Sequence, residues 1–375
     1  MLVLFMYKFY IMEVIMKKNR ILIICIVLTM SIFVISACSN SKDSAAIAGT
    51  EKISVVCTIF PQYDWVREII GENTDDYEIT LLMDDGIDLH SYQPSAKDIA
   101  TISNCDLFIY VGGESDKWVD DVLKETVNKE MKVISLLEVL GDAVKKEEII
   151  EGMEHEHHEH DEDEDHEHDE DEDHEHEEDE HDEDEHHEHD EDESHFHEDD
   201  EHVWLSLKNA QVIINSIKNA LEEIDSKNSE IYAKNYNNYV EKLSELDMEY
   251  QAAVNSSKRK TILFADRFPF RYMVDDYGLS YHAAFAGCSA ETEASFETIA
   301  FLSGKTEELK LSSVLVIENS DNKLANTIIE NTASKNQEIL VMDSLQSVTN
   351  KKLKDGYSYL SVMKNNLEIL KKALN

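Results

Sequence analysis

Short apolar runs alternate with amphipathic stretches in the first half of the chain, from Lys52 to about Leu140. The runs are rich in β-branched residues, which predicts strands, and the stretch 63–70 has the spacing of a helix. The predicted strands are residues 54–59, 77–82, 107–111 and 132–136. Because parallel strands need a crossover between them, this alternation predicts a parallel sheet with helices on both faces.

The second half of the chain repeats this pattern. Its short apolar runs, again separated by helical stretches, are residues 261–264, 313–317 and 338–342. Between the two halves, apolar residues recur at helical spacing from Ile217 to Val254, and residues 208–255 contain no Gly or Pro. We therefore predict an α/β fold of two similar lobes with mainly parallel sheets flanked by helices. One long helix, with a break near residues 227–229, joins them.

The N-terminus has the pattern of a secretory signal that ends in a lipobox. A cationic stretch at 17–20 precedes an apolar run at 21–35, which is too short for a comfortable membrane span and ends in Ser36-Ala37-Cys38. We predict translation from Met16, cleavage before Cys38 and acylation of its thiol, which would hold the protein on the outer face of the cell membrane. The alternative is a retained membrane anchor in which Cys38 is incidental.

These patterns divide the chain into six segments. They are a signal peptide at 1–37, a flexible linker at 38–51, an N-terminal α/β lobe at 52–150, a disordered loop at 151–201, the end of the N-lobe site with the connecting helix at 202–256, and a C-terminal α/β lobe at 257–375.

The formal charge of the chain is −46, and it is concentrated in one segment. Residues 154–201 hold 32 of the 80 acidic side chains and no basic ones, so the remaining chain is only moderately acidic. An acidic surface repels phosphates, which argues against nucleic acid as a partner and favours a cation. Beyond Cys25 and Cys38, only Cys57, Cys105 and Cys288 remain, without close spacing, so neither a disulfide framework nor a thiolate zinc site is indicated.

The acidic segment also carries 14 of the 17 histidines. It lacks the apolar residues needed to offset the entropy of ordering, so we predict a disordered loop. Neutral imidazole binds zinc, nickel and copper, and we interpret the loop as an auxiliary metal-gathering segment; a solvated acidic tail is the alternative. Its histidines are His155, His157, His158, His160, His166, His168, His174, His176, His181, His186, His187, His189, His195 and His197.

Four potential metal ligands lie near predicted strand ends or at the start of an ordered stretch. His90 follows the strand at 77–82, His202 begins the stretch after the acidic loop, Asp266 follows the strand at 261–264, and Asp343 follows the strand at 338–342. Ligands bind at the carboxyl ends of parallel strands, so two residues from each lobe predict a metal site in the cleft between the lobes. Taken singly, each could be a helix cap or a loop residue.

Several motifs resemble the zinc and manganese solute-binding lipoproteins of ABC importers. They are Gly86-Ile87-Asp88-Leu89-His90-Ser91-Tyr92-Gln93-Pro94-Ser95, the segment 112–118, His202-Val203-Trp204-Leu205 and the C-terminal helix at 359–367. The resemblance covers residues 52–375 and implies two α/β lobes joined by one long helix, with an ABC permease and its ATPase as partners. Zinc members of that family often carry a His-rich loop just before the second ligand histidine, where the acidic loop of this chain lies.

The resemblance also implies roles for single residues. It makes His90 and His202 the N-lobe ligands and Asp343 the acidic fourth ligand, with Glu318 as an alternative. The family has a histidine after the first C-lobe strand, a position that here falls at Ala265 or Asp266; we assign Asp266 because alanine cannot ligate, and His282 is its competitor. Two imidazoles and two carboxylates suit Zn²⁺, while the additional carboxylate also suits Mn²⁺.

The resemblance implies a monomeric protein that captures zinc and delivers it to an importer, not an enzyme. A metal-dependent hydrolase could use a similar ligand set, but the sequence has no HExxH and no Gly-x-Ser-x-Gly motif. The same motifs would also fit a manganese-binding member of the family or a surface adhesin lipoprotein.

Overall fold

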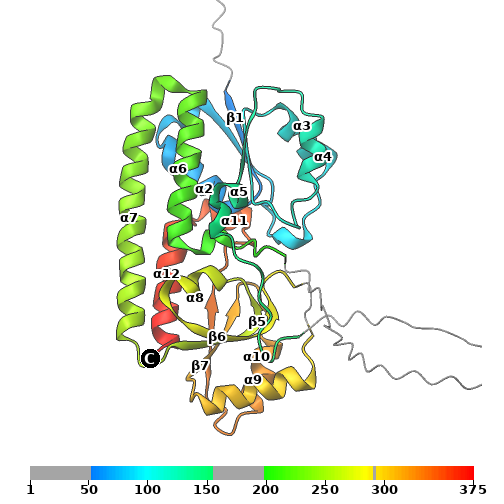
Figure 1. Cartoon of the computed structure of the whole chain (residues 1–375), viewed down its shortest axis with the longest axis vertical. Coiled ribbons are helices and arrows are strands. Elements are labelled where there is room, and N and C mark those ends of the chain that lie inside the picture. The colour runs from blue at the N-terminus through cyan, green and yellow to red at the C-terminus, as the bar shows by residue number, and fades with distance from the viewer. Residues whose placement is uncertain (1–51, 155–197, 290–292) are drawn as a thin grey trace, which may run out of the picture. The chain divides into compact units, whose positions relative to one another are not determined.

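The structure, a computed structural model, describes residues 52–154, 198–289 and 293–375 (Figure 1). The predicted signal peptide, Cys38 and the 14 histidines at 155–197 lie outside these residues. In the part of the chain that is described, no helix is long and apolar enough to cross a membrane.

The N-terminal lobe contains a parallel sheet of four strands in the order β2-β1-β3-β4. The strands are β1 (Ile53–Cys57), β2 (Tyr77–Leu81), β3 (Leu107–Tyr110) and β4 (Lys132–Ser135). The helices of this lobe are α2 (Phe60–Ile70), α3 (Ala96–Asn104), α4 (Val119–Lys124) and α5 (Leu136–Leu140). All four predicted strands of this half are present, and their ends differ from the prediction by one or two residues.

The C-terminal lobe repeats the same topology, with a parallel sheet in the order β6-β5-β7-β8. The strands are β5 (Thr261–Phe268), β6 (Ser280–Ala286), β7 (Ser313–Ile317) and β8 (Glu338–Met342). The helices are α8 (Arg271–Tyr277), α9 (Phe296–Glu308), α10 (Lys323–Glu330), α11 (Asn350–Lys354) and α12 (Tyr359–Ala373). In each lobe the second strand along the chain lies at the edge beside the first, so β6 is the counterpart of β2.

Two helices, α6 (Leu207–Ile224) and α7 (Ser229–Ser256), lie between the sheets in sequence. The predicted break is real: the chain reverses at residues 225–228, and α6 and α7 pack side by side (Figure 1). The connecting helix is therefore α7 alone, whose 28 residues span about 42 Å. It contacts α2 and α6 on the N-terminal side and α8 and α12 on the C-terminal side.

One large hydrophobic core continues through both lobes. It includes Val55 and Cys57 of β1, Phe264 of β5 and the buried face of α7, whereas Val56 points into a separate cluster on the other side of the N-lobe sheet. Helix α7 thus packs against both lobes. Two α/β lobes on one long helix confirm the predicted fold class.

Residues 145–154 pack on the C-terminal lobe. The Lys145 N–H donates to Tyr272 Oη at 3.0 Å, and the Glu154 N–H donates to the Ala284 carbonyl at 2.9 Å. The predicted lobe boundary at residue 150 thus falls within a segment that already contacts the second lobe, and the six predicted segments stay predictions.

Candidate metal centre

His90 lies in a short 3-10 turn that follows β2. The Asp88 carboxylate holds this turn by accepting a hydrogen bond from the His90 backbone N–H at 3.0 Å. The Nδ1 atom of His90 lies 2.9 Å from Ser115 Oγ and 3.5 Å from Glu201 Oε2. These contacts orient the ring and leave Nε2 on its opposite side available as a ligand.

His202 is fully buried and precedes the 3-10 turn Val203–Leu205. Asp200 Oδ1 accepts a hydrogen bond from the His202 backbone N–H at 2.9 Å and lies 2.9 Å from its Nδ1. The neighbouring Trp204 is tied to the C-terminal lobe, because its Nε1–H donates to the Ser344 carbonyl at 2.9 Å. A carboxylate behind Nδ1 keeps the proton there and the lone pair on Nε2.

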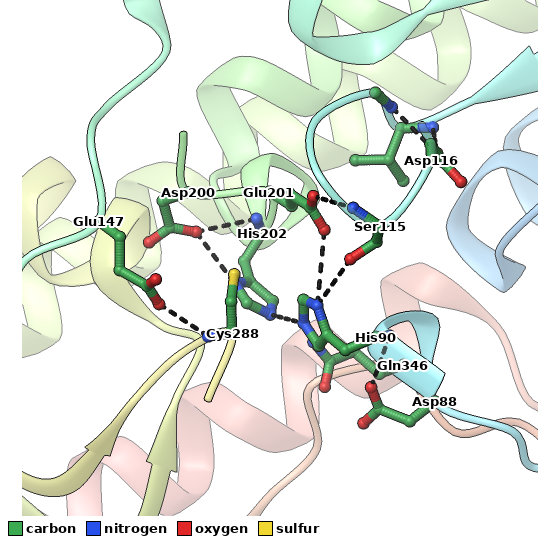
Figure 2. Close-up of polar contacts among 12 residues, drawn as sticks. Asp88, His90, Ser115, Asp116, Glu147, Asp200, Glu201, His202, Cys288 and Gln346 are labelled. Carbon is green, nitrogen blue, oxygen red and sulfur yellow. Dashed lines mark hydrogen bonds and ion pairs between the residues drawn. The ribbon is translucent and has the colours of Figure 1, made fainter. Parts of the chain in front are cut away.

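The two imidazoles face each other, and the distance between His90 Nε2 and His202 Nε2 is 3.2 Å (Figure 2). A tetrahedral zinc ion with Zn–N distances of about 2.0–2.1 Å places two ligand nitrogens about 3.3 Å apart. Since a carboxylate lies behind each Nδ1, both Nε2 atoms can point lone pairs at the same spot. The pair therefore fits two coordination positions of one divalent cation.

Burial and mutual repulsion keep the two imidazoles from being positively charged at the same time. Burial lowers the pKa of His90, and a positive charge on His202 lowers it further. Burial also opposes protonation of His202, yet its pKa is raised because Asp200 hydrogen-bonds and attracts the ring. Burial raises the pKa of Glu201 to about 7. Asp200, Glu201 and Glu147 all raise the pKa of His202 and so favour positive charge beside this ring, which a metal ion can supply.

Contacts across the lobes fix the segment that carries the first imidazole. Arg267 at the end of β5 forms an ion pair with Asp88, with 2.8 Å between Nη2 and Oδ2. The Gly86 N–H donates to the Val348 carbonyl at 3.0 Å, and Ser347 Oγ donates to the Gly86 carbonyl at 2.8 Å. Both lobes therefore determine where His90 lies.

Cys288 is the third potential ligand at this point, and it comes from the loop after β6. Its Sγ and the ligand nitrogens of His90 and His202 all lie within 4.8 Å of one another (Figure 2). The Cys288 N–H donates to Glu147 Oε1 at 2.7 Å, which holds the loop. Burial raises the pKa of the Cys288 thiol well above its usual value, and Glu147 raises it further.

The two predicted carboxylate ligands are not part of this group. Asp266 Oδ1 accepts a hydrogen bond from the Arg267 backbone N–H at 2.9 Å. Asp343 Oδ1 accepts hydrogen bonds from Tyr357 Oη at 2.7 Å and from the Leu345 N–H at 2.9 Å, and its Oδ2 lies 3.4 Å from Lys352 Nζ. The geometry supports His90 and His202 but not Asp266 and Asp343, and all four roles stay predictions.

The two competing residues, His282 and Glu318, also lie outside the group. His282 lies in β6, where its ring is 5.7 Å from that of Phe301. Glu318 is buried and accepts hydrogen bonds from the Ser344 N–H and Oγ, each at 2.7 Å. Glu318 thereby holds the turn after β8.

Sequence reasoning missed Cys288 because it sought pairs of cysteines at close spacing. It also missed Gln346, whose Nε2 lies 3.5 Å from His90 Nε2, and the ion pair of Arg267 with Asp88. Cys288 follows β6 as His90 follows β2, and the two strands have the same place in their sheets. This equivalence was not visible in the sequence, because β6 was not among the predicted strands.

The sequence profile of the family described as "Zinc-uptake complex component A periplasmic" (ZnuA) matches residues 55–373, nearly all of the part that folds into the two lobes. The chain belongs to the ZnuA family. It is 30% identical over 368 residues to the zinc-binding protein AdcA of Streptococcus pyogenes serotype M6, with 95% of this chain and 61% of AdcA covered. It thus spans about three fifths of that relative.

Other members of the ZnuA family match this chain over most of their own length. The high-affinity zinc uptake system protein ZnuA of Bacillus subtilis is 29% identical over 342 residues, which are 91% of this chain and 93% of that protein. The crystal structure of the Zn(II)-bound ZnuA-like domain of Streptococcus pneumoniae AdcA superposes with a TM-score of 0.61 at 26% identity, covering 86% of this chain and 99% of the domain. The family and the fold that the sequence predicted are confirmed.

Proposed function

We propose that this chain captures zinc outside the cytoplasmic membrane as the solute-binding component of a zinc importer. The observation that carries the proposal is the pair of imidazole Nε2 atoms 3.2 Å apart, each backed by a carboxylate, between the two lobes of a ZnuA-family fold. Here zinc is the cargo, so the site has to bind and also release it.

Two comparisons support zinc as the cargo. The Streptococcus pyogenes relative is named a zinc-binding protein, and the Bacillus subtilis relative is named a high-affinity zinc uptake protein. The donor atoms of this chain agree with those names. Imidazole nitrogen suits zinc, whereas manganese prefers carboxylate and carbonyl oxygen, and neither Asp266 nor Asp343 belongs to the group around His90.

The location and partners follow from the same reasoning. A Streptococcus pneumoniae relative, 29% identical over 339 residues, is named a zinc-binding lipoprotein. By analogy we place this chain on the outer face of the membrane through a lipid on Cys38, with an ABC permease and its ATPase as partners. In this role it acts as a monomer, has no nucleic-acid ligand and carries out no catalysis.

The histidines at 155–197 act in this proposal as a reservoir of weak sites. Many similar, adjacent ligands give capacity without a fixed geometry, whereas selection of one metal needs a rigid site. The reservoir ends at residue 197 and His202 follows only five residues later. Metal collected along this segment is therefore concentrated close to the rigid site.

The test is zinc binding by the purified full chain and two single variants. The His90→Ala variant removes one of the facing nitrogens, and we expect tight zinc affinity to fall by roughly 100-fold or more, since loss of a mere supporting contact already costs about 10- to 100-fold. The matched control is His282→Ala, a partly buried histidine outside the group. Competition against a zinc-specific chelator measures both variants.

Two other results would count against the proposal. If both variants keep the tight site, the facing imidazoles do not bind zinc and the proposed function loses its main support. If the His282→Ala variant is the more damaging one, the zinc site lies elsewhere in the C-terminal lobe.

A further inference from the structure

We propose that Cys288 is the third protein ligand of this centre, so that the metal is held by two imidazole nitrogens and one thiolate sulfur. The inference rests on the proposed function because it concerns the same site. It differs from the expectation drawn from the sequence, in which Asp266 and Asp343 supplied oxygen to the metal.

The distances allow this ligand set. Within the described parts of the chain, His90, His202 and Cys288 form the one group of three His, Cys, Asp or Glu residues that could hold a metal ion, and their ligand atoms all lie within 4.8 Å of one another. Tetrahedral zinc with Zn–S near 2.3 Å and Zn–N near 2.05 Å requires nitrogen-to-sulfur distances of about 3.6 Å. A shift of up to about 1.2 Å, which rotation of the Cys288 side chain can supply, brings Sγ into place.

The loop that carries Cys288 is held against the second imidazole. Gly287 packs so closely on His202 that an added Cβ would lie 3.0 Å from its Cε1 and 2.9 Å from the Phe268 carbonyl oxygen. On the other side, Glu147 accepts the Cys288 N–H. The thiol therefore sits beside the imidazoles because the backbone on both sides is fixed.

Carboxylates near the site each have an oxygen engaged by another group of the protein, and the remaining Glu201 Oε2 lies 3.5 Å from His90 Nδ1, on the side of the ring opposite the ligand nitrogen. Asp200 Oδ1 lies against His202, Glu201 Oε1 accepts the Ser115 N–H at 2.8 Å, and Glu147 Oε1 accepts the Cys288 N–H at 2.7 Å. These groups orient and balance the charge of the ligands. The thiolate is then the anionic ligand that reaches the metal directly.

This ligand set also determines the class of metal. Binding forms a metal–sulfur bond and releases the thiol proton to solvent, so a divalent ion gains one anionic ligand. Thiolate and imidazole together favour zinc and other thiophilic ions such as Co²⁺ and Cd²⁺ over Mn²⁺, which prefers oxygen. Manganese in large excess should therefore not displace zinc from this site.

X-ray absorption at the zinc edge tests the ligand directly. The full chain, loaded with one equivalent of zinc, should show one sulfur at about 2.3 Å together with nitrogen or oxygen at about 2.0 Å. The Cys288→Ser variant should lose the sulfur contribution, and its zinc affinity should fall by roughly tenfold or more. The Cys105→Ser variant is the matched control, because this buried cysteine of the N-terminal lobe lies outside the group.

A second metal and two further variants complete the test. Co²⁺ should give a near-ultraviolet sulfur-to-metal charge-transfer band in the wild type and in Cys105→Ser, but none in Cys288→Ser. Asp266→Asn and Asp343→Asn should keep both the band and the zinc affinity. Thermal unfolding with chelator present identifies any variant that fails to fold, and the wild-type spectra alone decide the ligand in that case.

Two results overturn the proposal and separate it from the proposed function. Tight zinc surrounded only by nitrogen and oxygen in the wild type, or sulfur that persists in Cys288→Ser, refutes Cys288 as a ligand but leaves zinc capture intact. A wild type that binds no zinc tightly refutes both.

Discussion

Replacing Gly287 by alanine tests how closely the C-terminal lobe is packed against the metal centre. The backbone at Gly287 does not have a positive φ, so alanine is not excluded by conformation. The added Cβ would lie 2.9 Å from the Phe268 carbonyl oxygen, 3.0 Å from His202 Cε1 and 3.1 Å from His202 Nδ1. Relief of these contacts requires that the loop or the imidazole move.

The magnitude follows from the size of this overlap. Ordinary carbon contacts begin near 3.4 Å, so relief needs a shift of about 0.3–0.5 Å, and overpacking of this kind costs about 1–3 kcal/mol of stability. Metal ligands must be held within about 0.5 Å of their productive positions, so a shift of this size uses most of that margin, and the ring that moves belongs to His202. We therefore expect zinc affinity to fall by about 10- to 100-fold and the melting temperature of the metal-free protein to fall by a few degrees.

Gly304→Ala is the matched control. This exposed glycine lies within α9, and nothing lies within 4 Å of an added Cβ. Alanine there should stabilise the protein by about 0.5–1 kcal/mol, because it reduces the entropy lost on folding, and should leave zinc binding unchanged.

The assay combines thermal unfolding in chelator with zinc competition titration for the wild type and both variants. Wild-type stability and wild-type affinity in Gly287→Ala would refute the close contact between the β6 loop and His202. A loss of stability without any loss of affinity would show that the loop moves and the imidazole does not.

Two further predictions concern other parts of the chain. Deletion of residues 155–197 with a short linker should keep the tight zinc and the melting temperature and remove the weak additional sites, which zinc stoichiometry measures; the flanking segments are already held by the bridge between Lys146 and Asp199. Asp64 is buried and accepts the Tyr359 N–H at 2.9 Å, and burial raises its pKa to about 7. Because the folded state then holds a proton that the unfolded state has already lost, Asp64 lowers stability as the pH rises from about 4 to 7, by at most about 1.4 kcal/mol per pH unit. Asp64→Asn should flatten this part of the stability profile in chemical denaturation, and a slope that does not change would refute the assignment to Asp64.

The sequence alone determined most of the fold. Strands β1, β3 and β7 are buried on both faces over most of their length and appear as short apolar runs, and β8 is also a short apolar run although its Val341 is exposed. The buried face of α7 repeats at helical spacing over 28 residues. β6 escaped detection because its sequence, Ser280 to Ala286, begins with exposed or partly buried residues, and its apolar part consists mainly of alanine, which is depleted in strands. Such patterns reveal elements because local side-chain periodicity reflects burial.

Only two of the three residues of the candidate metal centre could be identified from the sequence. Motifs around His90 and His202 marked those two residues, although 112 positions separate them. Cys288 lies beside these two histidines, whereas Asp343 contacts Tyr357 and Lys352 instead. Both outcomes depend on how the strand ends of the two lobes meet. Ligands close in sequence can be recognised from their spacing, but this centre draws single residues from three distant loops. Only the packing of the lobes against each other brings those loops together, and it therefore decides which side chains can reach one metal ion.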